Sequence, residues 1–408
     1  MIFYLIHFLE NILGFNVPAA FEYTSTRMML SAVTSLVITI FLGPLFIRKL
    51  QELKIGQTIR KDEESPLLGQ LHHKKKDTPT MGGALILTSM LIAMLIWMNV
   101  RHVFTLILLM TTLVLGFLGG WDDFLKLKFK NSKGLSGKGK LLIQGFLSGF
   151  IVLYLLFPSF SEKIHTGNFF HPLVVKEIQH VPLKSQAQHH AITLEGSSYA
   201  ARIYIPFFKE PVIIFSGAFL VIAAFFMMCV IVGSSNAVNL TDGLDGLVSG
   251  CLIMVASCLA MIAFVSNNID FASYLNILYI EGSGEIAVYL SAFVGACIGF
   301  LWYNGYPAEV FMGDTGSLPL GGILGVSAVL LKREFLLALI GGIFVAEAIS
   351  VILQVASYRL RNKKRIFLCA PLHHHFEYKG WPETKVVIRF WIIGLLLAII
   401  GIASLKLQ

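Results

Sequence analysis

Apolar stretches recur along almost the whole chain, and each has roughly the 20 residues that an α-helix needs to cross the hydrocarbon core of a bilayer. Of the 408 residues, 56% are hydrophobic and only 14% are charged, whereas about 25% of residues are charged in soluble domains. The pattern of a membrane β-barrel, which alternates over segments of about 10 residues, does not occur. The sequence therefore predicts an all-α, polytopic integral membrane protein.

About ten apolar segments are predicted to span the bilayer and to form a single domain over residues 1–408. The apolar segment 1–22 is expected to form a short helix on or in the bilayer. Residues 158–210 are expected to be a loop insertion, in which "HPLVVKEIQHVPL" and "ARIYIPFF" are typical of short strands. The predicted spans are 27–47, 82–100, 103–121, 141–157, 212–233, 246–265, 286–302, 316–331, 335–357 and 386–405.

The positions of Lys and Arg predict the orientation of these spans, because loops on the cytoplasmic side are rich in both residues. If the loop after the first span lies inside, the inside segments and Arg389 hold 22 of the 32 basic residues. Both termini and the insertion 158–210 then lie outside, and Lys332 and Arg333 in an outside turn are the exception. The basic loops account for the net charge of +8, so nucleic acid is not an expected partner.

Five polar clusters stand out against this background, and all five fall in segments predicted to lie inside. Their common side suggests one composite site built from several loops. The clusters are "HHKKKDTPTMGG" (72–83), "GGWDDF" (119–124), "SSNAVNLTDGLDGL" (234–247), "YNGYPAEVFMGDTGS" (303–317) and "APLHHHFEYKGW" (370–381).

Asp122 and Asp123 lie at the C-terminal end of an apolar helix, where the helix dipole disfavours negative charge. A solvated helix end with an ion pair to Lys126 would explain a single acid. Adjacent helical side chains point about 100° apart, so the two acids suggest two roles. One would face a metal or phosphate, and the other would face a proton that is to be removed.

Asp314 lies in "FMGDTGS", between glycines and just before a predicted span. The free N–H groups at the start of that helix favour a phosphate, which an acid would repel unless a cation lay between them. Mg²⁺ is usually held by one or two carboxylates together with substrate phosphates. Asp314 is therefore the first candidate metal ligand. Phe311 is a candidate stacking surface, with ordinary packing as the alternative.

The segment "NLTDGLDGL" has two alternative interpretations. Thr241 and Asp242 are good helix caps, and capping alone would explain them. Asn236, Asn239 and Asp245 add further polar side chains that suit the hydroxyl groups and base edge of a nucleoside.

The histidine run 373–375 does not have zinc-finger spacing. Its alternatives are a solvated loop, donors to a diphosphate, or proton transfer. The basic run 361–365 is explained better as a topology anchor, whereas the run 74–76 precedes "TPTMGG", a shaped turn that an anchor alone would not need.

The residues alone favour phosphoryl transfer between a nucleotide-linked donor and a lipid acceptor, with a transporter as the alternative. The chain has neither the GxxxxGK[ST] motif of P-loop ATPases nor the GxSxG motif of serine hydrolases. In their order along the chain, the five clusters resemble the polyprenyl-phosphate N-acetylhexosamine-1-phosphate transferase superfamily. "LHHHFE" resembles its muramoyl branch.

This resemblance implies a bacterial cytoplasmic (inner) membrane enzyme with its active site on the cytoplasmic face. The implied reaction joins UDP-N-acetylmuramoyl-pentapeptide and undecaprenyl phosphate to give lipid I and UMP, with Mg²⁺, as the first membrane step of peptidoglycan synthesis. A related N-acetylglucosamine 1-phosphate transferase and a lipid flippase are the alternatives. The resemblance also implies a homodimer.

The resemblance assigns roles to individual residues as well. Asp314 and Asp122 would hold the metal, one of Asp122 and Asp123 would deprotonate the lipid phosphate, and His373 and His374 would contact the sugar-phosphate. The uridine side would use Lys75, Asn236, Asp242, Gly243, Leu244, Asp245, Asn304 and Phe311. Further substrate-binding candidates are Thr80, Asn239, His375 and Lys138, the last as a lysine on the phosphate side.

Overall fold

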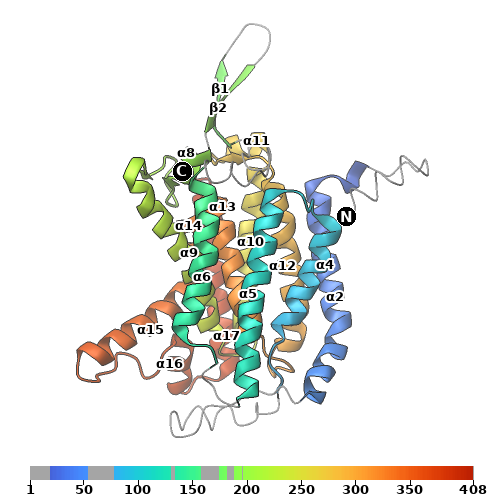
Figure 1. Cartoon of the computed structure of the whole chain (residues 1–408), viewed down its shortest axis with the longest axis vertical. Coiled ribbons are helices and arrows are strands. Elements are labelled where there is room, and N and C mark those ends of the chain that lie inside the picture. The colour runs from blue at the N-terminus through green and yellow to red at the C-terminus, as the bar shows by residue number, and fades with distance from the viewer. Residues whose placement is uncertain are drawn as a thin grey trace, which may run out of the picture.

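A computed structural model describes residues 19–53, 78–129, 134–157, 174–181, 188–194 and 196–407. Its helices form an elongated bundle with a β-hairpin at one end (Figure 1). Helix α2 begins and helix α17 ends near the hairpin (Figure 1). The C-terminal end of α5 lies at the opposite end of the bundle, together with α15 and α16 (Figure 1). Residues 1–18, which include most of the predicted N-terminal helix, lie outside the described residues.

Eight helices among the described residues are long and apolar enough to cross a membrane. They are α2 (Thr24–Glu52), α5 (Val103–Lys128), α6 (Gly137–Leu156), α9 (Leu220–Thr241), α10 (Leu247–Ser266), α12 (Ser283–Asn304), α15 (Gly342–Leu360) and α17 (Glu383–Ser404). Two shorter apolar helices are α4 (Gly83–Trp97) and α13 (Asp314–Leu330). The remaining helices are η1 (Ala19–Phe21), α8 (Gly196–Ala200), η4 (Gly217–Phe219), α11 (Ile269–Tyr274), α14 (Glu334–Ile340) and α16 (Leu372–Tyr378).

Each predicted span contains a helix, and two of the boundary differences bear on the arrangement of the polar clusters. The predicted span 335–357 is divided at Gly341 into α14 and α15, because a Gly-Gly pair favours a break in a helix. The helix predicted to end at residue 121 continues to Lys128, so Asp122 and Asp123 lie within α5. A polytopic helical membrane protein is thus confirmed, and the count of ten spans and the side of the termini stay predictions.

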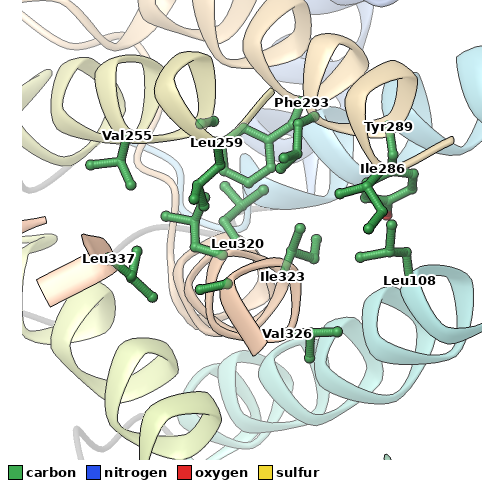
Figure 2. Packing of buried hydrophobic residues seen from close by; sticks show 14 of the residues in the cluster. Leu108, Val255, Leu259, Ile286, Tyr289, Phe293, Leu320, Ile323, Val326 and Leu337 are labelled. Atoms are coloured by element: carbon green, nitrogen blue, oxygen red, sulfur yellow. The ribbon is translucent and has the colours of Figure 1, made fainter. Parts of the chain in front are cut away.

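Helix α13 lies at the centre of the bundle and is buried along its whole length after Asp314. Figure 2 shows its side chains Leu320, Ile323 and Val326 surrounded by residues of α5, α10, α12 and α14. A helix that is apolar on every side belongs in the interior of a bundle. Its central position holds Asp314, its first residue, against several neighbouring helices.

The insertion contains the predicted strands. β1 (Val174–Val181) pairs with β2 (Gln188–Leu194) and with β5 (Tyr279–Ile280) in one antiparallel sheet. A second pair joins β3 (Arg202–Ile203) to β4 (Ile213–Ile214). The hairpin of β1 and β2 projects from the end of the bundle away from the end of α5 (Figure 1).

The two basic residues that departed from the predicted charge distribution are buried rather than free. The ammonium group of Lys332 lies 2.5 Å from Glu334 and donates to the carbonyl of Ala200. The guanidinium group of Arg333 lies over the ring of Tyr204. Because Lys332 is neutralised inside the fold, it does not count as a free positive charge in that turn.

Candidate active site

Asp122, Asp123 and Asp314 converge where the end of α5 meets the start of α13. One carboxylate oxygen from each lies within 4.8 Å of the other two. Asp122 and Asp123 are buried, and the Asp314 side chain is 13% exposed. The three acids that the sequence singled out therefore form one cluster, which we call the aspartate cluster.

Glycines allow the backbones to approach closely enough for this convergence. A Cβ on Gly119 of α5 would lie 2.0 Å from the carbonyl oxygen of Asp314. A Cβ on Gly83 would lie 2.1 Å from the amide nitrogen of Gly316. Two backbone hydrogen bonds, from the N–H groups of Gly82 and Gly83 to the carbonyls of Phe311 and Met312, tie the turn before α4 to the segment before α13. The motif "TPTMGG" is thus a docking segment for the residues that precede Asp314.

Two lysines separate the carboxylates. The ammonium group of Lys126 lies 2.7 Å from Asp122, 3.4 Å from Asp123 and 3.2 Å from Asp314. That of Lys140, at the start of α6, lies 2.8 Å from Asp122 and 2.6 Å from Asp314. Three carboxylates and two ammonium groups leave the cluster with a net charge of one negative. These ion pairs offset the cost of acids at the C-terminal end of a buried helix.

The two adjacent acids have different surroundings, as their helical spacing predicted. Asp122 accepts the backbone N–H of Leu135 in the connection to α6. Asp123 accepts both the backbone N–H and the hydroxyl of Thr315 in the first turn of α13. Asp122 therefore joins α5 to α6, and Asp123 joins α5 to α13.

The aspartate cluster could hold a metal ion. Its donors are carboxylate oxygens, the hard ligands that Mg²⁺ prefers, and its net negative charge favours a cation. The amide of Asn239 donates to Asp314 at 2.9 Å and to Ser317 at 2.8 Å, which orients the Asp314 carboxylate. The residues present therefore fit a divalent ion.

The turn between α9 and α10 lies next to this cluster. Burial first, and then the negative charges of Asp314 and Asp123, raise the pKa of Asp242 to about 8. Asp245 of the same turn is buried and accepts the backbone N–H of Ala308. Asn304 is buried too, and its amide contacts Gly246, Ser249 and Val310. Asn304 thus joins this turn to the segment before α13. Its buried side chain supports the turn and is not exposed at the surface of the site.

The three histidines are divided between burial and partial exposure on α16. His373 is buried, with its Nδ1 3.2 Å from Glu347 of α15. His374 is hydrogen bonded through Nδ1 to Glu377 at 2.7 Å. His375 accepts the backbone N–H of Leu368. A Cβ on Gly243 would lie 2.3 Å from Nε2 of His373, so His373 reaches the turn that carries Asp242.

The remaining candidates lie around these groups. Asn236 donates to Gln144 of α6, Leu244 is buried, and Phe311 and Thr80 are partly exposed in the two docked segments. Lys75 lies outside the described residues. Lys138 is exposed on the first turn of α6, whereas Lys140 makes the ion pairs with the aspartate cluster.

Sequence reasoning missed three residues of this region. Lys126 was assigned only a helix-end ion pair, and Lys140 and Glu347 were not singled out. An acid in the apolar stretch that forms α15 was the available signal for Glu347, because ionisable residues in spans tend to be functional. For Lys140 the available signal was "GKGK", which does not say which lysine faces inward.

The class of protein follows from the fold and the site: it is a multi-pass membrane protein with eight candidate spans around a central apolar helix. The acids and lysines gather at one end of the bundle, which suits an enzyme that acts at the membrane surface. Comparison with known proteins narrows this class. The model of Glycosyl transferase family 4 matches residues 105–332.

Similar proteins cover nearly the whole chain. A phospho-N-acetylmuramoyl-pentapeptide-transferase of Protochlamydia amoebophila is 65% identical over 100% of both chains. Proteins of the same name from Thermodesulfovibrio yellowstonii and Desulfotalea psychrophila are 45% and 43% identical, over 98% and 97% of this chain and 97% and 96% of their own. The chain belongs to the phospho-N-acetylmuramoyl-pentapeptide-transferase family within Glycosyl transferase family 4.

Proposed function

We propose that the chain transfers phospho-N-acetylmuramoyl-pentapeptide from UDP-N-acetylmuramoyl-pentapeptide to undecaprenyl phosphate, with lipid I and UMP as products. The names and identities of its relatives support this reaction. The observation in the structure that carries it is the aspartate cluster with Lys126 and Lys140. One phosphoanhydride is exchanged for another, so the reaction needs no separate energy source.

The catalytic residues would act mainly by positioning and charge stabilisation, as in other phosphoryl transfers. Lys126 and Lys140 place ammonium groups where phosphate charge would gather. One of Asp122 and Asp123 accepts the proton of the lipid phosphate. His373 and His374 contact the sugar-phosphate, and the 242–245 turn with Asn236 contacts the uridine.

Mg²⁺ is the proposed cofactor, held by Asp314 and Asp122. When bound, it would neutralise charge on the diphosphate of the donor. Lys126 and Lys140 contact the same two carboxylates. A bound ion would therefore use carboxylate oxygens of Asp122 and Asp314 that these lysines also contact. Asn239 keeps one Asp314 oxygen in place through its amide N–H.

The test is UMP release by purified protein in detergent, supplied with undecaprenyl phosphate and each UDP-sugar, with and without Mg²⁺. We expect release with the muramoyl-pentapeptide donor only and only with the metal. Asp314→Asn should abolish release while thermal stability stays close to the parent value. Turnover of UDP-N-acetylglucosamine would favour the related transferase, and no release with any donor would favour a transporter.

The remaining proposals concern location and assembly. We expect a protein of the bacterial inner membrane, with the aspartate cluster on the cytoplasmic side and both termini and the β1–β2 hairpin on the periplasmic side. A single cysteine introduced at Lys138 should react with an impermeant thiol reagent only in inverted vesicles, in a variant without the native cysteines. The homodimer can be tested by the mass of the detergent-solubilised particle.

A further inference from the structure

Glu347 is an acid in the second turn of the apolar helix α15, and its side chain is fully buried. A buried carboxylate is costly unless hydrogen bonds or an opposite charge compensate it. The function proposed above gives Glu347 no role, so its position calls for an explanation.

Among the described residues, the hydrogen bonds of the Glu347 carboxylate go to the start of α16, where the histidine run lies. Oε2 accepts the backbone N–H of Leu372 at 2.6 Å. Oε1 accepts the backbone N–H of His373 at 3.1 Å and lies 3.2 Å from the Nδ1 of the same residue. One carboxylate thus hydrogen bonds to the backbone at the start of α16 and lies beside the imidazole ring of His373.

The other side of the ring faces the candidate site. Both ring nitrogens of His373 are buried and form no hydrogen bond among the described residues, so Nδ1 lies beside the Glu347 carboxylate at ion-pair distance and Nε2 has no polar partner there. Nε2 points at Gly243, where a Cβ would approach it to 2.3 Å. Gly243 follows Asp242, whose surroundings include Asp314 and Asp123. An unpartnered buried nitrogen therefore lies at the turn that connects to the aspartate cluster.

We propose that Glu347 is the positioning residue for His373. A carboxylate beside Nδ1 favours the proton on that nitrogen, as do the carboxylates that lie behind metal-binding histidines and fix their tautomer. Nε2 is then the nitrogen presented to the donor substrate at the 242–245 turn. This inference rests on the proposed function, because it assumes that His373 contacts the sugar-phosphate.

The deciding experiment is a double-mutant cycle on UMP release with Glu347→Gln and His373→Ala. Glutamine keeps the shape, but it removes the charge and one acceptor for the N–H groups of α16. We expect Glu347→Gln to lower kcat about 10- to 100-fold, the range seen when second-layer partners are removed, while KM changes less than twofold. In the His373→Ala background the same substitution should change kcat less than twofold, because its target is gone.

Two further variants separate positioning from stability. Ser350→Ala removes the hydroxyl that donates to the carbonyl of Glu347 at 2.7 Å and leaves the carboxylate in place, so kcat should stay near the parent value. Glu347→Asp retains the charge on a shorter side chain and should retain more activity than Glu347→Gln. It also carries the test if the glutamine variant does not fold.

Each outcome is informative. An equal fall in kcat in both backgrounds means that Glu347 acts through the general fold, and it overturns the proposal. Unchanged kcat in Glu347→Gln overturns it as well. A parent protein without UMP release would instead remove the proposed function, and the role of Glu347 with it. If the parent is active and the cycle is additive, the positioning role of Glu347 is wrong, but the proposed function is not affected.

Discussion

At the scale of single residues, Lys140 and Lys138 form a matched pair on the first turn of α6. Lys140 contacts two carboxylates of the aspartate cluster, whereas Lys138 is exposed. Removing a charge that stabilises a developing negative charge costs about 100- to 1,000-fold in kcat. We therefore expect Lys140→Met to lower kcat at least 100-fold and Lys138→Met to change it less than threefold. Steady-state UMP release measures both, and the reverse order would restore Lys138 as the lysine of the site.

Asp242 gives the molecule a predictable dependence of stability on pH. Burial and the charges of Asp314 and Asp123 raise its pKa to about 8, against about 3.9 for a free Asp. Below about pH 4 the carboxyl is protonated in both the folded and unfolded states. As the pH rises from there towards 8, the unfolded state loses this proton first, so stability falls and then levels off.

Asp242→Asn has no such ionisation. In detergent without divalent ions, the melting temperature of this variant minus that of the parent should grow from pH 5 to pH 8. Differential scanning fluorimetry across that range measures it. A difference that stays constant with pH would contradict the raised pKa.

At the scale of elements, close contact between helices decides where the acids lie. Gly119 and Gly120 are neighbours on α5, but a Cβ on Gly119 would lie 2.0 Å from Asp314 and one on Gly120 no closer than 3.8 Å to Thr315. Gly→Ala favours a helix by about 0.5–1 kcal/mol at either position. At Gly119, overpacking of about 1–3 kcal/mol opposes this gain. We expect Gly119→Ala to lower both the melting temperature and UMP release, and Gly120→Ala to lower neither. Equal behaviour of the two variants would mean that α5 and α13 are not in tight contact.

At the scale of the whole molecule, the bundle separates the aspartate cluster from the β1–β2 hairpin, which lies at the opposite end (Figure 1). Residues 176–192 can be replaced by a two-residue turn, because the pairs of Val174 and Val175 with β5 would remain. We expect kcat for UMP release to stay within twofold of the parent value. A larger loss, with the melting temperature unchanged, would show that the insertion acts on the site from a distance.

The sequence alone determined the helical membrane class and singled out the three acids of the aspartate cluster. Membrane spans are recognisable from length and composition, and Asp122, Asp123 and Asp314 contrast with apolar neighbours. Their convergence followed from the predicted common side of the loops. The strands β1 and β3 of the insertion were also predictable from residue pattern and turn signals, whereas β2 was not predicted.

Only the tertiary structure decided which neighbours surround the aspartate cluster in the candidate site. Residues two apart on a helix point about 200° apart, so the orientation of α6 selects Lys140 over Lys138. The contact between Glu347 and His373 depends on the packing of α15 against α16. The buried position of Asn304 depends on the path of the segment before α13, whose Val310 carbonyl accepts its amide N–H. These contacts join residues far apart in the chain, and local sequence carries no information on the packing that brings them together.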